Sequence, residues 1–207
     1  MRGQGPTVIK LGGSFAFSAD LGEWIAAIAR CGGRAVIAPG GGPFANVVRT
    51  AQAQMGFDDL AAHRMALLAM EQYGCAIKSL HPALSLADSF DSIRRCLADD
   101  RVPVWLPTRT ALDAAEIAQS WDVTSDSLAA WLAGKIDAER LLLIKHIEPA
   151  RGAMSVADLA ARDIVDKAFA NILAASGVPA FILGRKDHAA IGRLLNGEPM
   201  GIRIIAQ

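Results

Sequence analysis

Short apolar runs alternate with longer helical segments along this chain, and this alternation constrains the fold more than any other feature. The run 141–144 (LLLI) is continuously apolar, as expected of a strand that is buried on both faces. Strands separated by helices favour an α/β layer structure with a mostly parallel sheet. The expected strands are 7–11, 34–38, 102–106, 141–144, 180–183 and 202–205.

Helix signals fill the gaps between these strands. Asp20 followed by Glu23 is typical of a capping box at a helix start, and Pro43 suits the first turn of another helix. An apolar stripe in the segment 58–80 is expected to face the core, with the members Leu60, Ala61, Met65, Leu68 and Ala69. We expect helices over 20–30, 43–51, 58–80, 88–97, 125–134, 165–175 and 189–195, and a loop over 151–155.

The amino-acid composition restricts the possible functions of the protein. The 207 residues carry 21 basic and 21 acidic side chains, and 52% of them are hydrophobic. This apolar content excludes disorder, and the length predicts one domain over residues 1–207. A net charge of zero offers no general attraction to nucleic acid or to a membrane surface, so local features must bind any anionic ligand.

Cysteine usage and the first residues bear on the compartment. The three cysteines stand far apart without a metal-binding spacing, which is typical of a reducing environment. Residues 1–7 are polar and lack the apolar core of a signal peptide, and no apolar run is long enough to span a bilayer. We therefore expect a cytoplasmic protein. The four histidines are scattered, so we expect packing or surface roles for them and assign no metal ligand.

The first expected strand ends in the motif Lys10-Leu-Gly-Gly-Ser14. Ligands of open α/β sheets gather at the carboxyl ends of strands, where this motif stands. Adjacent glycines let backbone N–H groups turn toward an anion, and a neighbouring lysine adds a mobile positive charge. An ordinary strand-to-helix turn with a surface lysine explains the motif equally well, because Gly-Gly turns are common.

A second glycine-rich loop, Gly40-Gly41-Gly42, stands between the next strand and the next helix. Each glycine costs about 0.5–1 kcal/mol relative to alanine in backbone entropy. Three in a row therefore favour a close approach of the backbone to a ligand at the helix N-terminus over a flexible surface loop. Neither loop matches the P-loop pattern GxxxxGK[ST] or the dinucleotide pattern GxGxxG, so the standard nucleotide fingerprints are absent.

Acidic and hydroxyl side chains cluster where the helix 125–134 is expected to begin. Asp122 and Asp126 flank Thr124 and Ser125, either of which explains one residue as a helix N-cap. A helix start needs one N-cap residue, which leaves Asp122 and Asp126 unexplained, and these acids could orient lysines or hold a metal-bound nucleotide. Lys167 stands near the start of the segment 165–175, where the helix dipole disfavours a cation, and this is a weak functional signal by itself.

In this order, the motifs resemble the amino acid kinase family, which includes carbamate, acetylglutamate, uridylate and aspartate kinases. The resemblance covers nearly the whole chain and rests on residues 8–14, 39–44, 122–126, 141–144 and Lys167. It implies a three-layer α/β/α sandwich and a homodimer or higher homo-oligomer. It also implies a kinase that uses ATP and Mg²⁺ to phosphorylate a small molecule without a covalent intermediate.

The resemblance assigns roles residue by residue. Lys10 and Lys167 would neutralise charge on the transferring phosphoryl group, and Asp126 would orient these two lysines. Such roles suit phosphoryl transfer, which depends on positioning and charge stabilisation. The implied contacts to the ATP phosphates are Gly12, Gly13 and Ser14, and we expect Lys145, where the chain departs from the family pattern, to touch a nucleotide phosphate. The implied contacts to the acceptor are Gly40, Gly41, Gly42, Asp122 and Thr124.

Departures from the family pattern bear on the acceptor. Asp122 replaces an Asn that contacts the acceptor in acetylglutamate kinases, and an acid there favours an acceptor with an amine. Lys145 begins a segment (KHIE) that is acidic in many relatives. The runs 63–66 and 121–132 resemble a short branch with a kinase of [5-(aminomethyl)furan-3-yl]methyl phosphate in methanofuran-type cofactor synthesis. That acceptor carries both a phosphate and an amine, and its product would be a diphosphate.

Other functions remain open at this point. A kinase with another acceptor, such as a nucleoside monophosphate or a carboxylate, would use the same motifs. A non-enzymatic anion- or nucleotide-binding protein could share the fold, because fold does not determine function. The presence of Lys10, Lys167 and Asp126 together argues against a simple binder. An NAD-binding protein is less favoured because GxGxxG is missing.

Overall fold

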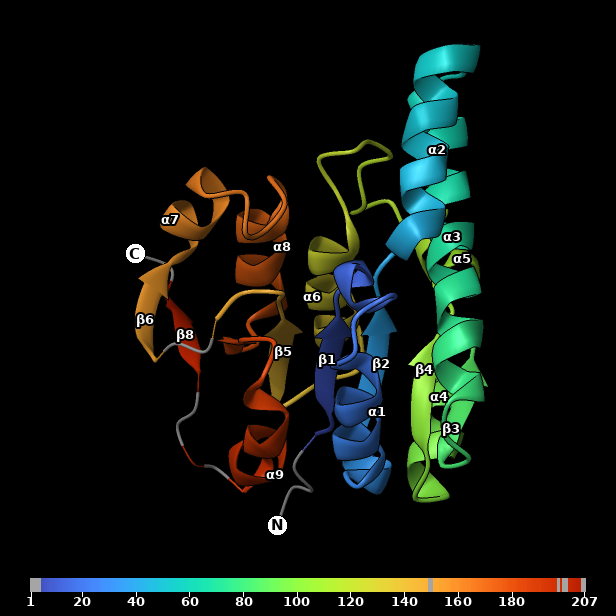
Figure 1. Cartoon of the computed structure of the whole chain (residues 1–207). Coiled ribbons are helices and arrows are strands. Elements are labelled where there is room, and N and C mark those ends of the chain that lie inside the picture. The colour runs from blue at the N-terminus through green and yellow to red at the C-terminus, as the bar shows by residue number, and fades with distance from the viewer. Residues whose placement is uncertain (1–4, 149–150, 197, 199–200, 206–207) are drawn as a thin grey trace.

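An eight-stranded sheet runs through the middle of the molecule, and helices cover both of its faces (Figure 1). The structure is a computed structural model that describes residues 5–148, 151–196, 198 and 201–205. Residues 1–4 of the polar N-terminal segment lie outside the described residues. The strand order is β3-β4-β2-β1-β5-β7-β8-β6, and the neighbouring strands are parallel except for β7 and β8. The predicted three-layer α/β/α sandwich with a mostly parallel sheet is confirmed.

The strands follow the apolar runs of the sequence closely, with two exceptions. The segment 151–155, expected as a loop, contains a partly exposed strand that pairs with the last strand of the chain, and its GAMS sequence has no apolar run. A further short strand over 84–87 has no clear sequence signal. The strands are β1 (Thr7–Leu11), β2 (Ala35–Pro39), β3 (Leu84–Ala87), β4 (Val102–Trp105), β5 (Arg140–Ile144), β6 (Gly152–Ser155), β7 (Ala180–Leu183) and β8 (Ile202–Ile205).

Each expected helix is present with corrections at its ends, whereas the short helices over Thr108–Ala111 and Val156–Ala161 were not expected from the sequence. The Asp20 side chain makes no capping hydrogen bond, so the expected capping box is wrong. The helix expected from 165 begins at Phe169, which places Lys167 before the helix. The helices are α1 (Leu21–Ala29), α2 (Gly42–Met55), α3 (Asp59–Ser79), α4 (Phe90–Ala98), α5 (Thr108–Ala111), α6 (Ser125–Lys135), α7 (Val156–Ala161), α8 (Phe169–Ser176) and α9 (Ala190–Leu195).

Helices α2 and α3 lie side by side and project beyond the sheet (Figure 1). The apolar stripe expected to bury α3 is wrong for Leu60, Met65 and Leu68, which are exposed. The buried face of α3 instead includes His63 and Leu67, because α2 and the sheet pack against a different side of the helix. Among the described residues, no helix combines the length and the apolar character needed to cross a membrane.

Two apolar cores lie on opposite faces of the sheet, and alternation along the strands divides the side chains between them. On β1, Val8 belongs to the core beside α6, whereas Ile9 and Leu11 belong to the core beside α1. Lys10 shares the parity of Val8 and therefore faces α6. On β5, Leu141 and Leu143 face the same way, so Lys145, two positions further on, continues the row that faces α6.

Candidate active site

Three charged side chains meet at the carboxyl ends of β1 and β5. We call Lys10, Asp126 and Lys145 the ion-pair cluster. Lys10 and Asp126 are each 5% exposed, and Lys10 Nζ lies 2.9 Å from Asp126 Oδ1. Lys145 Nζ donates a hydrogen bond of 2.7 Å to Asp126 Oδ2. Because β1 and β5 are parallel neighbours with Leu11 paired to Ile144, the two ammonium groups approach one carboxylate from adjacent strands.

The cluster has unusual proton affinities because it is buried. Burial raises the pKa of Asp126, but the ammonium groups of Lys10 and Lys145 outweigh this and hold the pKa below its usual value. Burial, together with the positive charge of Lys10, lowers the pKa of Lys145 to about 8. The cluster therefore combines a carboxylate that stays ionised with a lysine that loses its proton under mildly alkaline conditions.

The two glycine-rich loops pack directly against each other beside this cluster. A Cβ atom on Gly13 would lie 2.2 Å from the backbone nitrogen of Gly42, and one on Gly40 would lie 2.5 Å from that of Gly13. Gly42 has a φ of +57°, which an L side chain rarely adopts. The glycines at 13 and 40 therefore permit contact between two backbones, which is a structural reason for them in addition to ligand approach.

Other residues of these loops lie near charged groups or at the surface. A Cβ atom on Gly12 would lie 3.7 Å from Lys10 Nζ. The exposed Ser14 and the glycines Gly41 and Gly42 line a cavity described below. The structure thus brings together Lys10, Lys145, Asp126 and the two glycine-rich loops. The roles that the resemblance assigns to these residues stay predictions.

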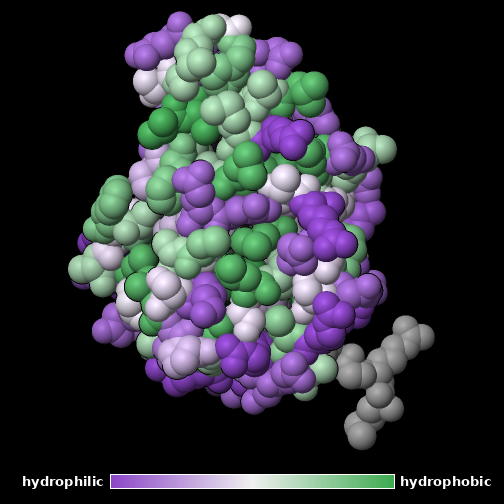
Figure 2. Space-filling model, turned by 90° about the vertical axis from the view of Figure 1, so that its right-hand side faces the viewer, coloured by the Kyte–Doolittle hydropathy of each residue, from purple (hydrophilic) through white to green (hydrophobic). Residues whose placement is uncertain are grey.

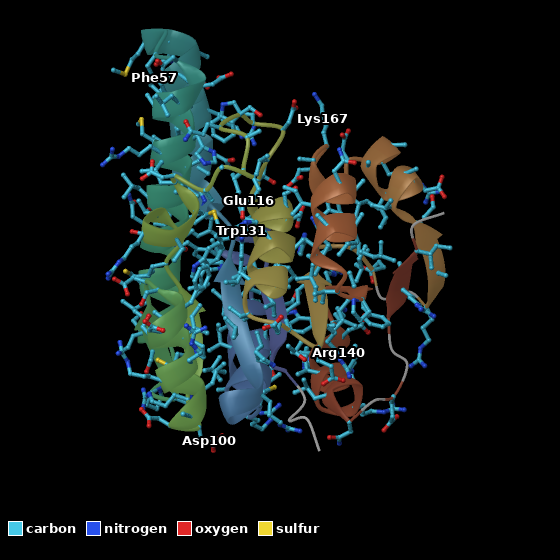
Figure 3. All side chains as sticks on the ribbon, turned by 180° about the vertical axis from the view of Figure 1, so that it is seen from behind. Phe57, Asp100, Glu116, Trp131, Arg140 and Lys167 are labelled. Carbon is cyan, nitrogen blue, oxygen red and sulfur yellow. The ribbon has the colours of Figure 1, made fainter. Side chains whose placement is uncertain are left out.

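Lys167 occupies a different position from the one implied by the resemblance. Its Nζ lies 3.1 Å from Asp122 Oδ1 at the surface, with 85% of the lysine side chain exposed. Figure 3 shows Lys167 above the upper end of α8, pointing out of the molecule. The expectation that Asp126 contacts Lys10 and Lys167 is therefore wrong for the second lysine. Lys145 takes this place because β5 lies next to β1, whereas Lys167 precedes an outer helix.

The first turn of α6 has a polar partner that the sequence did not indicate. Thr124 is the N-cap residue, as one of the two expected alternatives, but its hydroxyl donates to Asp166 Oδ2 at 2.7 Å instead of capping the helix. Asp166 also accepts from the backbone N–H groups of Thr124 and Ser127. A sequence signal for Asp166 is hard to find, because the partners stand about forty positions apart in the chain.

A cavity of about 410 Å³ opens between the glycine-rich loops, α2, α3 and the start of α6. Its charged side chain is Arg49, whose guanidinium carbon lies 3.9 Å from the centre of the Trp121 ring. The Trp121 indole N–H in turn donates to Gln52. The lining also includes the apolar residues Leu67, Met70, Val123 and Leu128 and the polar residues Asn46 and Thr124. No carboxylate belongs to this lining among the described residues.

His63 lies at this cavity, and its burial on α3 agrees with packing, one of the two roles expected from the sequence. The side chain is 5% exposed, and among the described residues its Nε2 atom has no hydrogen-bond partner. Burial lowers its pKa, which favours the neutral ring. A buried polar atom without a partner is costly, so a polar ligand atom in the cavity would satisfy it. Asp122, in contrast, does not line the cavity.

The donor set of the site suits a ligand that carries phosphate groups. Lys10 and Lys145 supply positive charge, and the glycine-rich loops supply backbone next to it. Both carboxylate oxygens of Asp126 face lysines, so this residue is not a free metal ligand. Across the described part of the chain, no group of three or more His, Cys, Asp or Glu side chains is arranged to hold a metal ion. A Mg²⁺ ion would therefore be held mainly through phosphate oxygens, as is usual for this ion.

Comparisons with known proteins agree with this geometry. The model of the amino acid kinase family matches residues 5–149. The chain is 23% identical over 202 residues to the [5-(aminomethyl)furan-3-yl]methyl phosphate kinase of Methanocaldococcus jannaschii. The aligned region covers 92% of this chain and 93% of that protein.

Solved structures share the fold. The uridylate kinase from Archaeoglobus fulgidus has a TM-score of 0.75 at 18% identity, covering 97% of this chain and 100% of that one. The UMP kinase from Bacillus anthracis has a TM-score of 0.71 at 14% identity, covering 98% and 96%. Because the family match spans more than half of the sequence, this chain belongs to the amino acid kinase family and is a kinase of that family.

Proposed function

We propose that this protein transfers the terminal phosphoryl group of ATP, bound with Mg²⁺, to the phosphate of a small monophosphate ester. The favoured acceptor is [5-(aminomethyl)furan-3-yl]methyl phosphate, and the product is its diphosphate. The observation that carries this proposal is the buried ion-pair cluster beside two glycine-rich loops and a cavity. The similarity to a kinase of that acceptor, over 92% of this chain, supports the choice of substrate.

The proposed reaction needs positioning more than covalent chemistry. An oxygen of the acceptor phosphate forms a bond to the terminal phosphorus of ATP, and the bond from that phosphorus to the bridging oxygen breaks to release ADP. The attacking oxygen is already ionised, so no side chain has to remove a proton. Lys10 and Lys145 would stabilise negative charge that spreads over the transferring group, and Asp126 would hold both ammonium groups in place.

The two substrates would meet at the paired loops, because Gly13 and Ser14 line the same cavity as Gly41, Gly42 and Thr124. Gly12, Gly13, Ser14 and Lys145 are proposed to hold the ATP phosphates. Gly40, Gly41, Gly42 and Thr124 are proposed to face the acceptor, in agreement with the cavity lining at Gly41, Gly42 and Thr124. Lys167 and Asp122 would have to separate before the lysine could reach a phosphate and the carboxylate an amine.

An assay of ADP release tests the proposal. The purified protein is incubated with MgATP and one of three acceptors: the furan phosphate, UMP or acetylglutamate. Release of ADP with the furan phosphate, together with a diphosphate signal in the ³¹P NMR spectrum, would support the proposal. Activity with UMP or acetylglutamate but not with the furan phosphate would overturn the acceptor. ATP binding without turnover of any acceptor would point to a binding protein.

A homo-oligomer and a cytoplasmic location belong to the same proposal. Apolar side chains are exposed on α2 and α3, namely Val47, Met55, Leu60, Met65 and Leu68. Figure 2 shows hydrophobic residues among polar ones on the side of the molecule formed by these helices. Contact between copies through this side would cover apolar surface, and light scattering after size-exclusion chromatography would measure the mass of the assembly. A monomer at micromolar concentration would contradict it.

A further inference from the structure

Asp166 connects the last third of the chain to the start of α6, and no role follows for it from the sequence motifs. Its carboxylate accepts four hydrogen bonds from the first turn of α6. Oδ2 accepts from Thr124 N at 3.0 Å, Thr124 Oγ1 at 2.7 Å and Ser127 N at 3.1 Å, and Oδ1 accepts from Ser127 Oγ. Asp166 therefore takes over the N–H of Ser127, which the N-cap side chain usually satisfies, and also accepts from the N–H of the N-cap residue Thr124 itself.

The same turn carries the carboxylate of the ion-pair cluster. Asp126 lies between Thr124 and Ser127 in sequence, and it contacts Lys10 and Lys145. A shift of this turn would move the Asp126 carboxylate relative to both ammonium groups. Because a misplacement of about 1 Å can cost on the order of 100-fold in rate, the anchoring of this turn bears directly on the site.

Asp166 also stands next to Lys167 in the chain. The N–H of Ala168 donates to the carbonyl of Asp122 at 3.0 Å, and Lys167 pairs with the side chain of Asp122. The segment 166–168 is thus tied to the segment 122–127 by backbone and side-chain bonds. This connection keeps the exposed Lys167 at the edge of the site, although its own side chain has few contacts.

We propose that Asp166 is a positioning residue for phosphoryl transfer: it anchors the first turn of α6, and through it Asp126, and it keeps the segment of Lys167 beside the ion-pair cluster. The inference rests on the proposed kinase function. It goes further because it assigns to the Asp166 carboxylate the alignment of two parts of the site, the first turn of α6 with Asp126 and the segment that carries Lys167. Asp166 itself would touch neither substrate.

Charge gives a way to separate this role from simple helix capping. The charged groups that act on Lys145 are Lys10, Asp126 and Asp166, and the negative charge of Asp166 favours the protonated form of Lys145. Removal of that charge should lower the pKa of Lys145 further. An Asp166→Asn variant keeps the size and much of the hydrogen bonding but removes the charge, whereas Ser127→Ala keeps the charge and removes one hydrogen bond.

The experiment compares these two variants with Asp158→Asn. Asp158 makes similar contacts with Ser155 at the start of α7, so this variant is a matched control in the same third of the chain. We expect kcat to fall about 10–100-fold in Asp166→Asn and to stay at the wild-type level in Asp158→Asn. The alkaline limb of the pH–rate profile should move to lower pH in Asp166→Asn and stay in place in Ser127→Ala.

An NMR titration provides a readout that does not need turnover. The ¹³Cε signal of Lys145, assigned with a Lys145→Arg variant, should titrate at lower pH in Asp166→Asn than in the wild type. A lower melting temperature with an unchanged Lys145 titration and an unchanged kcat would overturn the proposal and leave Asp166 as a helix cap. If the wild type turns over no acceptor, the kinase proposal fails, and the titration still decides the effect of Asp166 on Lys145.

Ser127→Ala keeps the proposal testable if Asp166→Asn does not fold. Loss of one bond to Asp166 should reduce kcat several-fold while the titration of Lys145 stays at the wild-type pH. A wild-type kcat in a Ser127→Ala protein with a lowered melting temperature would contradict the positioning role. Asp166→Glu, which retains the charge, should keep the Lys145 titration close to that of the wild type.

Discussion

Two sets of lysine–aspartate contacts lie near the start of α6, and their surroundings differ sharply. In the ion-pair cluster, the side chains of Lys10 and Asp126 are 6% and 7% exposed. In the pair of Lys167 and Asp122, the side chains are 85% and 59% exposed. Charges interact strongly where water is excluded and weakly where it is present. The comparison teaches that the buried cluster is a fixed part of the site, whereas the exposed pair can separate at little cost.

Removal of the shared carboxylate should have the largest effect. An Asp126→Asn variant leaves the ammonium groups of Lys10 and Lys145 close together without a counter-charge. Loss of one partner from a buried pair costs roughly 3–5 kcal/mol, and we expect a loss of this size in the free energy of unfolding. Urea denaturation followed by circular dichroism measures it, and the ADP assay should show activity reduced on the order of 100-fold or more.

Asp122→Asn is the matched stability control for this change, because it removes a carboxylate from the exposed pair. Its free energy of unfolding should stay within about 1 kcal/mol of the wild type. Equal losses in the two variants would break the comparison between the buried and the exposed contacts. Such a result would mean that burial does not make the contacts of the ion-pair cluster contribute more to the free energy of unfolding than the exposed pair does.

The loop contact beside the cluster should give the next largest effect. In a Gly13→Ala variant the added Cβ would overlap the backbone of Gly42, at 2.2 Å from its nitrogen. Backbone atoms cannot move aside cheaply, so we expect a loss of about 1–3 kcal/mol in the free energy of unfolding, with reduced ADP release. Thermal and urea unfolding measure the stability. Gly22→Ala is the control, because a Cβ there meets nothing within 4 Å.

Gly22 lies inside α1, where alanine is the better helix former. The control should therefore be neutral or slightly more stable than the wild type. A Gly13→Ala protein with wild-type stability would show that the two loops are not held in contact. In that case, the glycine-rich loops would owe their composition to a ligand alone.

The pH dependence of activity sharpens the comparison further. The pKa of Lys145 is lowered to about 8, so its ammonium form is lost above that pH. The kcat/KM for ATP should fall as the pH rises through about 8, because the neutral amine cannot stabilise phosphate charge. A Lys145→Arg variant should keep its activity to higher pH, because a guanidinium does not titrate there. A fall at the same pH in this variant would assign the limb to another group.

The stability of the protein should respond to the same group with the opposite sign. Between about pH 8 and the ordinary lysine pKa of 10.5, the unfolded chain holds a proton on this residue that the folded protein has released. The contribution of Lys145 to the free energy of unfolding therefore rises with pH over this window while activity falls. Urea denaturation at several pH values, in the wild type and in Lys145→Arg, isolates this contribution.

Much of this arrangement follows from local sequence. The bounds of β1, β7 and β8 are confirmed to the residue, because each is a short segment of mostly apolar residues with turn residues beside it. The placement of Lys10 at the end of a central strand follows from the same pattern. These features depend on neighbours in the chain, and periodicity and turn residues report on such neighbours well.

The sequence could not predict the features that depend on packing between distant segments. The choice of Lys145 over Lys167 as the second partner of Asp126 depends on β5 lying beside β1. The bonds of Asp166 join residues 39 and 42 positions apart. His63 shows the same limit, because its burial at the cavity depends on which side of α3 meets α2 and the sheet.

The smallest expected effect concerns the exposed pair itself. A double-mutant cycle of Lys167→Ala and Asp122→Ala should give a coupling energy of about 0–1 kcal/mol in unfolding, and salt should weaken it.

If Lys167 acts on the phosphoryl group, Lys167→Ala should still lower kcat by at least about 10-fold while the melting temperature stays unchanged. A lysine that matters for rate but not for stability is expected of a side chain that leaves its partner when substrates bind. A coupling energy well above 1 kcal/mol would contradict this, because separation of the pair would then oppose catalysis.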